Sequence, residues 1–254
     1  MKVVILAGGF GTRLGKITET IPKPMVRIGN KPIIWHIMNY YSSFGYNDFV
    51  ICLGYKGEII KEYFINYTYY NSDFTIDYSN DEIKLYQPNN IDWKVTLVDT
   101  GLNTLKGGRL KRVEKYLDDI NFLTYGDGLS NIDITALLNF HKENNKIITI
   151  SGVNPPSRFG EISIDENNLV GKFTEKPQVS TGLINGGFMV FNKELLNYLD
   201  LECDLETEVF NKLVDDKNIV IYKHQGYWEC MDNERDLIHL EKIWNLGKAP
   251  WAVK

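Results

Sequence analysis

The chain carries a glycine-dense turn, LAGGFGTRL, directly after its first apolar run. Gly8, Gly9 and Gly11 permit positive φ and a close approach of the backbone, so successive N–H groups can form a concave anion site. Thr12 adds a hydroxyl donor, and Arg13 adds a planar guanidinium that suits a triphosphate. Residues of these types in this order predict a binding site for a polyphosphate.

Two better-known glycine motifs are excluded by the residues that follow the turn. A Walker loop carries lysine and then serine or threonine directly after its last glycine, where this chain has Thr12 and Arg13. A dinucleotide fingerprint would require glycine or alanine where this chain has Leu14, and an acidic residue about 20 residues further on, which is missing. The turn therefore favours neither a kinase-type P-loop nor a nicotinamide site.

A lysine follows the turn, held between two prolines in the segment IPKPM. Pro22 and Pro24 fix the backbone in an extended path and keep the residue before each of them out of the helical region. A lone lysine more often faces solvent, but a lysine that is presented rigidly beside a glycine-rich turn is what a phosphate site needs. Lys23 is therefore expected to contact phosphate.

Two aspartates follow predicted strands that are far apart in the sequence. Asp127 lies in the segment YGDG, and Asp232 lies in the segment ECMD. Ligands of open α/β sheets bind at the carboxyl ends of strands, so Asp127 is expected on the same rim as the glycine turn. Either aspartate alone is more often a turn or cap residue. Two carboxylates with phosphate oxygens, however, make a suitable shell for Mg²⁺, which takes few protein ligands.

LAGGFGTRL and the PKPM that follows it resemble the signature of the sugar-phosphate nucleotidyltransferases. The resemblance continues through YGDG, FTEKP, NGGF, GYWECMD and GKAPW, and so covers essentially the whole chain. It implies an enzyme that joins a sugar 1-phosphate to a nucleotide and releases pyrophosphate, with one Mg²⁺ ion held by both Asp127 and Asp232. Members that use thymidine or uridine nucleotides usually carry a glutamine-containing strand, where this chain has Thr104 and then Gly107-Gly108-Arg109. This departure favours the cytidylyl branch, with CTP and glucose 1-phosphate as substrates.

The resemblance also implies roles for individual residues. Arg13 and Lys23 are expected to be catalytic, by stabilising charge on the α-phosphorus and on the departing pyrophosphate. The nucleotide is expected to contact Leu6, Ala7, Gly8, Gly9, Gly11, Thr12, Arg13, Lys23, Thr104, Gly108, Arg109 and Asp127. The sugar phosphate is expected to contact Tyr125, Gly160, Glu175, Lys176, Asn185, Gly186 and Trp228. The alternatives are an exposed helical turn for Arg109, a plain turn for the NGG segment and a core position for Trp228.

The expected reaction needs no side-chain base, since the attacking phosphate oxygen is already anionic near neutral pH. The histidines and cysteines show no triad or metal-ligand spacing, which agrees with this expectation. Two other functions stay open, namely transfer of a uridylyl or thymidylyl group and a non-catalytic nucleotide-sugar sensor on the same fold. Retention of both aspartates argues against the sensor. A nicotinamide oxidoreductase is a more distant alternative.

Composition limits the class of protein. The formal charge of −5 argues against nucleic acid as a partner. The densest basic run, KGGRLKR, is interpreted as a solvated first turn of a helix. No apolar run approaches the roughly 20 residues of a membrane span. Three widely spaced cysteines without a CxxC pair favour a reducing cytoplasm, and the resemblance implies a homo-oligomer, either a trimer or a hexamer.

The elements that must position these residues alternate between short β-branched runs and longer helical patterns, which is typical of βαβ units. Strands are predicted at VVILA, DFVICLG, VTLVDTG, NFLTYGDG and KIITISGV. Helices are predicted from Pro32 to Phe44, at EIIKEYFINY, from near Gly107 and around ITALLNFHKENN. The fold class is therefore α/β, with a Rossmann-like, mostly parallel sheet that is flanked by helices and complete near residue 153.

Two segments depart from this alternation. A period of two on either side of Asn80-Asp81 predicts a β-hairpin insertion. From Asn154 onward a hairpin at GEISIDENNLVGKFTEKP, strands at GFMVF and IVIYKH, two helices and a last helix from near Asn233 predict a small α+β part for sugar binding and oligomerisation. No linker separates the parts, so we expect a single domain, 1–254, with a nucleotide-binding core, 1–153, and a sugar-phosphate-binding and C-terminal part, 154–254.

Overall fold

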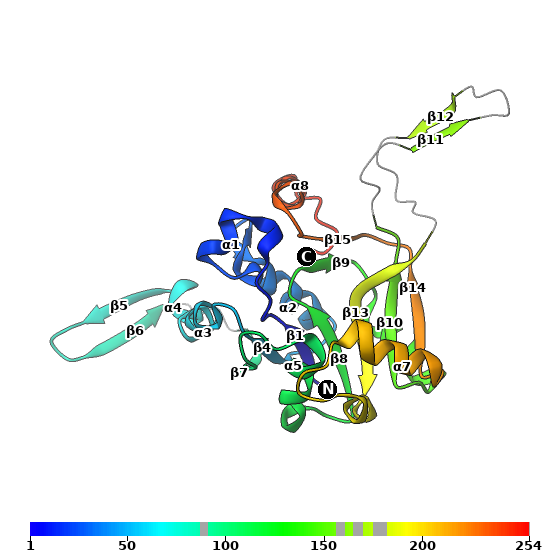
Figure 1. The fold of residues 1–254 in the computed structure, drawn as a ribbon. Helices are drawn as coiled ribbons and strands as arrows, with labels where there is room; N and C mark the ends of the chain where they lie inside the picture. The colour runs from blue at the N-terminus through cyan, green and yellow to red at the C-terminus, as the bar shows by residue number, and fades with distance from the viewer. Residues whose placement is uncertain (87–90, 156–160, 165–169, 175–181, 254) are drawn as a thin grey trace.

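The computed structural model of the chain describes residues 1–86, 91–155, 161–164, 170–174 and 182–253. Its centre is a seven-stranded sheet in the order β14, β10, β13, β8, β1, β4, β7 (Figure 1). These strands are β1 (Val3–Leu6), β4 (Asp48–Leu53), β7 (Lys94–Asp99), β8 (Ile120–Tyr125), β10 (Ile148–Val153), β13 (Ile184–Asn192) and β14 (Ile219–His224). The pairings of β13 with β8 and β10 are antiparallel, and the others are parallel. The predicted Rossmann-like, mostly parallel sheet is confirmed.

The sheet is not complete at residue 153, so that prediction was wrong. β13 lies between β8 and β10, and β14 forms the edge beyond β10. Val190 of β13 is paired with Phe122 on one side and with Thr149 on the other. The alternation of apolar and polar residues along a strand shows which face of that strand is buried. It does not show which other strand pairs with it, so the sequence did not place β13 and β14 in the central sheet.

Successive residues of β1 belong to two different hydrophobic layers, because side chains of a strand point alternately to opposite faces. Val3 and Ile5 pack in the layer that holds α2 (Ile33–Ser43) and α6 (Ile134–Asn144). Val4 and Leu6 pack in the layer that holds α5 (Lys106–Arg112) and α7 (Phe210–Asp215). Burial on both faces explains the unbroken apolar run at the start of the sequence.

The remaining helices are shorter or lie at the periphery. They are α1 (Lys16–Thr20), α3 (Gly57–Ile65), α4 (Tyr67–Tyr70) and α8 (Glu234–Asn245). The predicted start of the last helix is confirmed, because the side chain of Asn233 accepts the N–H of Asp236 and the carboxylate of Asp236 accepts the N–H of Asn233. Within the described ranges, no helix is both long enough and apolar enough to cross a bilayer.

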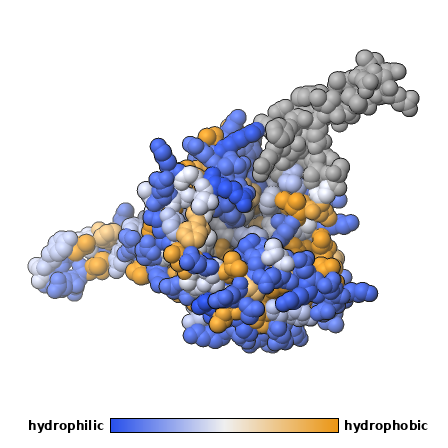
Figure 2. Space-filling view, viewed as in Figure 1, coloured by the Kyte–Doolittle hydropathy of each residue, from blue (hydrophilic) through white to orange (hydrophobic). Residues whose placement is uncertain are grey.

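A hairpin projects away from the sheet at the predicted insertion (Figure 1). It consists of β5 (Asp73–Asp77) and β6 (Glu82–Tyr86), which are joined through Asp81 with a φ of 54°. Figure 2 shows apolar side chains along this arm. Phe74, Ile76 and Ile83 are each more than one third exposed. The second predicted hairpin is also present, as β11 (Glu161–Ile164) and β12 (Val170–Thr174).

Short elements complete the fold outside the central sheet. The two-residue strands β2 (Arg27–Ile28) and β3 (Lys31–Pro32) pair with each other, and β9 (Gly128–Ser130) pairs with β15 (Trp228–Cys230). The 3₁₀ turns are η1 (Thr12–Leu14), η2 (Lys23–Met25), η3 (Glu114–Tyr116) and η4 (Lys193–Tyr198), and η5 (Leu205–Val209) is a π-helical turn. Four of the predicted site residues lie on these short elements, namely Thr12, Arg13, Lys23 and Trp228.

Candidate active site

The glycine turn leaves β1 at the carboxyl end of the sheet and continues into η1. Among its three glycines, only Gly11 has a positive φ, of 65°. Gly8 is required for another reason, because a Cβ there would overlap the guanidinium of Arg109. A Cβ on Gly9 would meet no atom within 4 Å. Positive φ therefore explains Gly11, and close approach explains Gly8.

Lys23 lies between Pro22 and Pro24 and begins a short 3₁₀ turn. Pro22 is extended, with φ of −70° and ψ of 149°, as predicted. The prediction that Lys23, before Pro24, is also extended was wrong, because Lys23 opens η2 and the N–H of Met25 donates to the carbonyl of Pro22 at 2.8 Å. Pro24 is tolerated in this first turn, since its missing N–H would have no helical acceptor. The side chain of Lys23 is only 12% exposed.

Two short strands bring the distant aspartates together. β9 and β15 pair in the antiparallel sense, with Gly128 opposite Cys230. The N–H of Met231 donates to the carbonyl oxygen of Asp127 at 3.0 Å. Asp127 precedes β9 and Asp232 follows β15, so both aspartates emerge from the same end of this strand pair.

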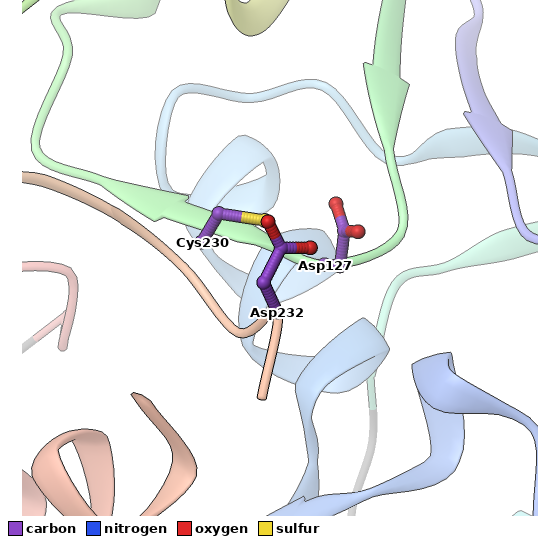
Figure 3. A group of neighbouring side chains, drawn as sticks. All are labelled: Asp127, Cys230 and Asp232. Carbon is purple, nitrogen blue, oxygen red and sulfur yellow. The ribbon is translucent and has the colours of Figure 1, made fainter. Parts of the chain in front are cut away.

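Lys23 lies between the two carboxylates. Its Nζ is 2.6 Å from Oδ2 of Asp127 and 2.9 Å from Oδ1 of Asp232. Nη1 of Arg13 lies 3.0 Å from Oδ2 of Asp232. Figure 3 shows the side chains of Asp127 and Asp232 pointing toward each other from separate segments of the chain. The structure thus gathers both cations and both acids into one cluster.

Burial and neighbouring charges shift the pKa values of Lys23 and Asp232 in opposite directions. Burial by itself lowers the pKa of Lys23, but the charge of Asp127 and the hydrogen bonds to both carboxylates raise that pKa above its ordinary value. Burial by itself raises the pKa of Asp232, but Lys23 and Arg13 outweigh burial and lower it. Because the pKa of Asp232 is depressed on folding, the stability that this carboxylate contributes is present above its unfolded pKa. It is lost as the pH falls through the folded value.

Three possible metal ligands meet in this cluster. A carboxylate oxygen of Asp127, one of Asp232 and Sγ of Cys230 all lie within 4.8 Å of one another (Figure 3). Burial, and after it the charge of Asp127, raise the pKa of Cys230, so the thiol stays protonated. Hard carboxylate oxygens suit Mg²⁺, whereas a thiol does not. No role was predicted for Cys230 from the sequence, where its nearness to Asp232 was the only signal.

A cavity of about 520 Å³ lies between the glycine turn and the loop before α5. Its lining includes most of the expected nucleotide contacts, namely Leu6, Ala7, Gly8, Gly9, Gly11, Thr12, Arg13, Lys23, Thr104, Arg109 and Asp127. Gly108 does not line it, because its backbone packs against the carbonyl of Leu201. Lining residues for which the sequence predicted no individual contact include Phe10, Leu102, Asn103, Leu105, Lys106 and Asp204. These residue types at these spacings form no recognisable motif.

Four of the residues expected to contact the sugar phosphate lie together. Tyr125 lines the cavity, and Nδ2 of Asn185 donates to its hydroxyl at 3.1 Å. The indole N–H of Trp228 donates to the carbonyl of Gly186 at 2.6 Å, while its ring also packs on the core. The plain-turn alternative for NGG was wrong, because these residues belong to β13. Gly160, Glu175 and Lys176 lie outside the described residues.

Comparison with known proteins identifies the family. The sequence model of the family described as "Nucleotidyl transferase" matches residues 2–242. The chain belongs to the nucleotidyl transferase family. The glucose-1-phosphate cytidylyltransferase of Salmonella typhi is 46% identical over 256 residues, which cover 100% of this chain and 99% of that protein. A Bacillus subtilis (strain 168) protein named probable glucose-1-phosphate cytidylyltransferase is 41% identical, with 100% of both chains covered.

Solved structures share the fold of this nucleotidyl transferase. The crystal structure of HddC from Yersinia pseudotuberculosis complexed with GMP-PN matches with a TM-score of 0.68 and 24% identity, over 96% of this chain and 99% of that chain. The family match and the full-length relatives confirm the predicted resemblance to the sugar-phosphate nucleotidyltransferases.

In this nucleotidyl transferase Arg109 is only 4% exposed. The exposed-turn alternative for Arg109, and the interpretation of KGGRLKR as a solvated turn, were therefore wrong. Residues Gly107 to Leu110 are all buried, because the two glycines let α5 approach the backbone of Leu201 and Cys203 closely. A basic run in sequence does not reveal this close packing.

The guanidinium of Arg109 is surrounded by backbone acceptors. It donates to the carbonyl oxygens of Gly8, Leu53, Gly101 and Leu102 and to Oγ1 of Thr100, at 2.7 to 3.1 Å. These acceptors belong to the glycine turn, the end of β4 and the loop after β7. Arg109 therefore ties the end of β4 to two segments that line the cavity, the glycine turn and the loop after β7.

We expect Arg109→Ala to lower the free energy of unfolding by about 2 to 4 kcal/mol, because several buried acceptors lose a charged donor. Urea denaturation followed by circular dichroism measures the change. Arg112→Ala is the matched control, since Arg112 is exposed at the end of the same helix and should change stability by less than about 0.5 kcal/mol. Equal stability of the two variants would contradict this role of Arg109.

Proposed function

We propose that the chain transfers a cytidylyl group from CTP to α-D-glucose 1-phosphate, forming CDP-glucose and releasing pyrophosphate. The observation that carries this proposal is the cluster in which Lys23 bridges Asp127 and Asp232 beside a cavity lined by the glycine turn. Two anionic substrates can meet only where cations offset their repulsion. The full-length relatives named glucose-1-phosphate cytidylyltransferase support the choice of substrates.

In the proposed reaction an oxygen of the sugar 1-phosphate attacks the α-phosphorus of CTP, in line with the leaving group. A new P–O bond forms, the bond from the α-phosphorus to the bridging oxygen breaks, and its electron pair leaves with pyrophosphate. The attacking oxygen is already anionic, since the second pKa of a phosphate monoester is about 6. The protein therefore has to position and neutralise the two substrates rather than remove a proton.

Each charged side chain has a distinct part in this proposal. Lys23 stabilises the charge that develops around the α-phosphorus. Arg13, whose side chain is 75% exposed, is free to turn its planar guanidinium toward the departing pyrophosphate. Lys176 holds the incoming sugar phosphate, with Glu175 meeting sugar hydroxyls, and both assignments rest on the sequence resemblance alone.

We propose that Mg²⁺ is the metal and that Asp127 and Asp232 hold it. The two carboxylates offer hard oxygen atoms within 4.8 Å of each other, which suits this ion. The ammonium of Lys23 already lies between them, so the position favours a cation. When bound, Mg²⁺ supplies charge neutralisation on phosphate oxygens, while the chain keeps the two carboxylates aligned through the pairing of β9 with β15.

A panel of nucleoside triphosphates and sugar 1-phosphates tests the proposal. CTP, UTP, dTTP and GTP are each combined with glucose 1-phosphate and with mannose 1-phosphate, and pyrophosphate release is measured. CTP with glucose 1-phosphate is expected to give the highest kcat/KM. A uridylyl- or thymidylyltransferase would prefer UTP or dTTP, and a nucleotide-sugar sensor would bind a nucleotide without releasing pyrophosphate. Either of these results would overturn the proposed function.

We further infer that the protein works in the cytoplasm as a homo-oligomer, either a trimer or a hexamer. The β5–β6 hairpin supports assembly, because it exposes Phe74, Ile76, Ile83 and Tyr86 on an arm that leaves the sheet. The three free cysteines agree with a reducing compartment. Light scattering would give the mass in solution, and a monomer at assay concentrations would contradict the oligomer.

A further inference from the structure

A chain of hydrogen bonds runs from Glu206 through Tyr125, which lines the cavity, to Asn185, which is proposed to contact the sugar. The proposed reaction assigns no part to the carboxylate of Glu206. Glu206 lies in η5, and π-helical turns are frequent at functional sites. The hydroxyl of Tyr125 donates to Oε1 of Glu206 at 2.5 Å. Nδ2 of Asn185 donates to the same hydroxyl at 3.1 Å. Glu206, Tyr125 and Asn185 therefore form a three-residue relay.

The carboxylate sets the direction of every hydrogen bond in this relay. An ionised carboxylate can only accept, so the single proton of the Tyr125 hydroxyl points to Glu206. Tyr125 must then accept from Asn185, which has to turn its NH₂ group toward the phenol. The other side of the amide agrees with this orientation, because Oδ1 of Asn185 accepts the N–H of Gly187 at 2.9 Å.

A cation lies beside Glu206, and burial keeps Tyr125 protonated. The ammonium of Lys106 forms an ion pair with Oε1 of Glu206 and lies 5.4 Å from the centre of the Tyr125 ring. Burial, and after it the charge of Glu206, raise the pKa of Tyr125. Gly187, with a φ of 76°, lets the Tyr125 ring lie against β13, where a Cβ would be 2.7 Å from Cδ2 of the ring.

We propose that Glu206 is a positioning residue for the sugar phosphate. By making Tyr125 an acceptor, Glu206 holds the Asn185 amide in one orientation, with its second N–H available to a hydroxyl group of the sugar. The inference rests on the proposed function, in which Asn185 contacts the sugar. Because Glu206 acts through Asn185, its loss should weaken binding of the sugar phosphate and leave the chemical step intact.

Glu206→Gln tests this role with almost no change of shape. Glutamine offers an NH₂ group as well as a carbonyl oxygen, so the Tyr125 hydroxyl is no longer forced to donate to residue 206. Asn185 can then turn its oxygen toward Tyr125 and lose the bond to Gly187. The KM for glucose 1-phosphate should rise about five- to tenfold, as expected for one misdirected hydrogen bond, with kcat and the KM for CTP unchanged.

Glu208→Gln is the matched control on the same helical turn. Glu208 is exposed, and its carboxylate accepts the N–H of Asp204 at 2.9 Å. This variant loses the same charge at a position that does not face Tyr125, so both KM values should equal those of the wild type. A rise in the KM for glucose 1-phosphate as large as that of Glu206→Gln would overturn the proposal.

Tyr125→Phe interrupts the same relay at its middle and covers the case in which Glu206→Gln does not fold. It should raise the KM for glucose 1-phosphate. The double variant of Tyr125→Phe and Glu206→Gln should show no further rise, because both substitutions disrupt the same hydrogen bond. An unchanged KM for glucose 1-phosphate in either single variant, or an equal rise for both substrates, overturns the proposal. If the wild type itself released no pyrophosphate from CTP and glucose 1-phosphate, the proposed function would fail as well.

Discussion

Replacing Lys23 with alanine will lower kcat by about 10²- to 10³-fold, the usual effect of losing one charge contact in a transition state. The ammonium of Lys23 contacts both Asp127 and Asp232, so its loss removes positive charge and also leaves two carboxylates facing each other. Their repulsion spreads the acids apart unless another cation takes the same place. Pyrophosphate release from CTP and glucose 1-phosphate measures the effect.

Lys16→Ala is the control for this variant, because Lys16 is an exposed lysine on α1, close to Lys23 in sequence. It should keep the wild-type kcat. The far-ultraviolet circular dichroism of Lys23→Ala should match that of the wild type, since both aspartates are partly exposed and can regain water. Near-normal turnover of a folded Lys23→Ala variant would refute the assignment of Lys23.

Replacing Asp127 with asparagine is expected to lower kcat by a comparable factor of about 10² to 10³. Asparagine keeps the shape of the side chain but lacks the charge that holds both Lys23 and a divalent ion. The Mg²⁺ concentration that gives half of the maximal rate should therefore rise by at least about tenfold. Initial rates over a series of Mg²⁺ concentrations measure both effects.

Asp133→Asn makes the same chemical change away from the cluster. Asp133 caps α6 by accepting the N–H of Ala136 at 2.8 Å, and asparagine serves equally well at this position. This control should leave both kcat and the dependence on Mg²⁺ unchanged. An Asp127→Asn variant with wild-type dependence on Mg²⁺ would show that Asp127 does not hold the metal.

The features that the sequence predicted correctly depend on local patterns. The buried run at Val3–Leu6, the hairpin around Asn80-Asp81 and the cap of α8 at Asn233 each follow from neighbouring residue types. The glycine turn and Lys23, which line one cavity, were also marked locally, by glycine density and by the flanking prolines, while their roles stay predictions. Asp127 and Asp232 were paired only through the family resemblance, since no spacing links residues so far apart.

The features that the sequence did not predict depend on contacts between distant segments. β13 and β14 join the central sheet through pairing that no local pattern encodes. Arg109 looked like part of a solvated basic turn because its backbone acceptors come from three separate segments. Glu206 has no motif around it, and its role follows only from its contacts with Tyr125 and Lys106.

The position of β13 limits how the enzyme can move. This strand carries Asn185 and Gly186, and it is bonded along one edge to β8, which leads to Asp127, and along the other edge to β10. Within the described sheet, a strand held on both edges leaves no hinge between β8 and β10, because separating them would break two ladders at once. The distance between Asn185 on β13 and Asp127 after β8 is therefore set by the sheet itself, and motion near the cavity is expected in segments outside the sheet.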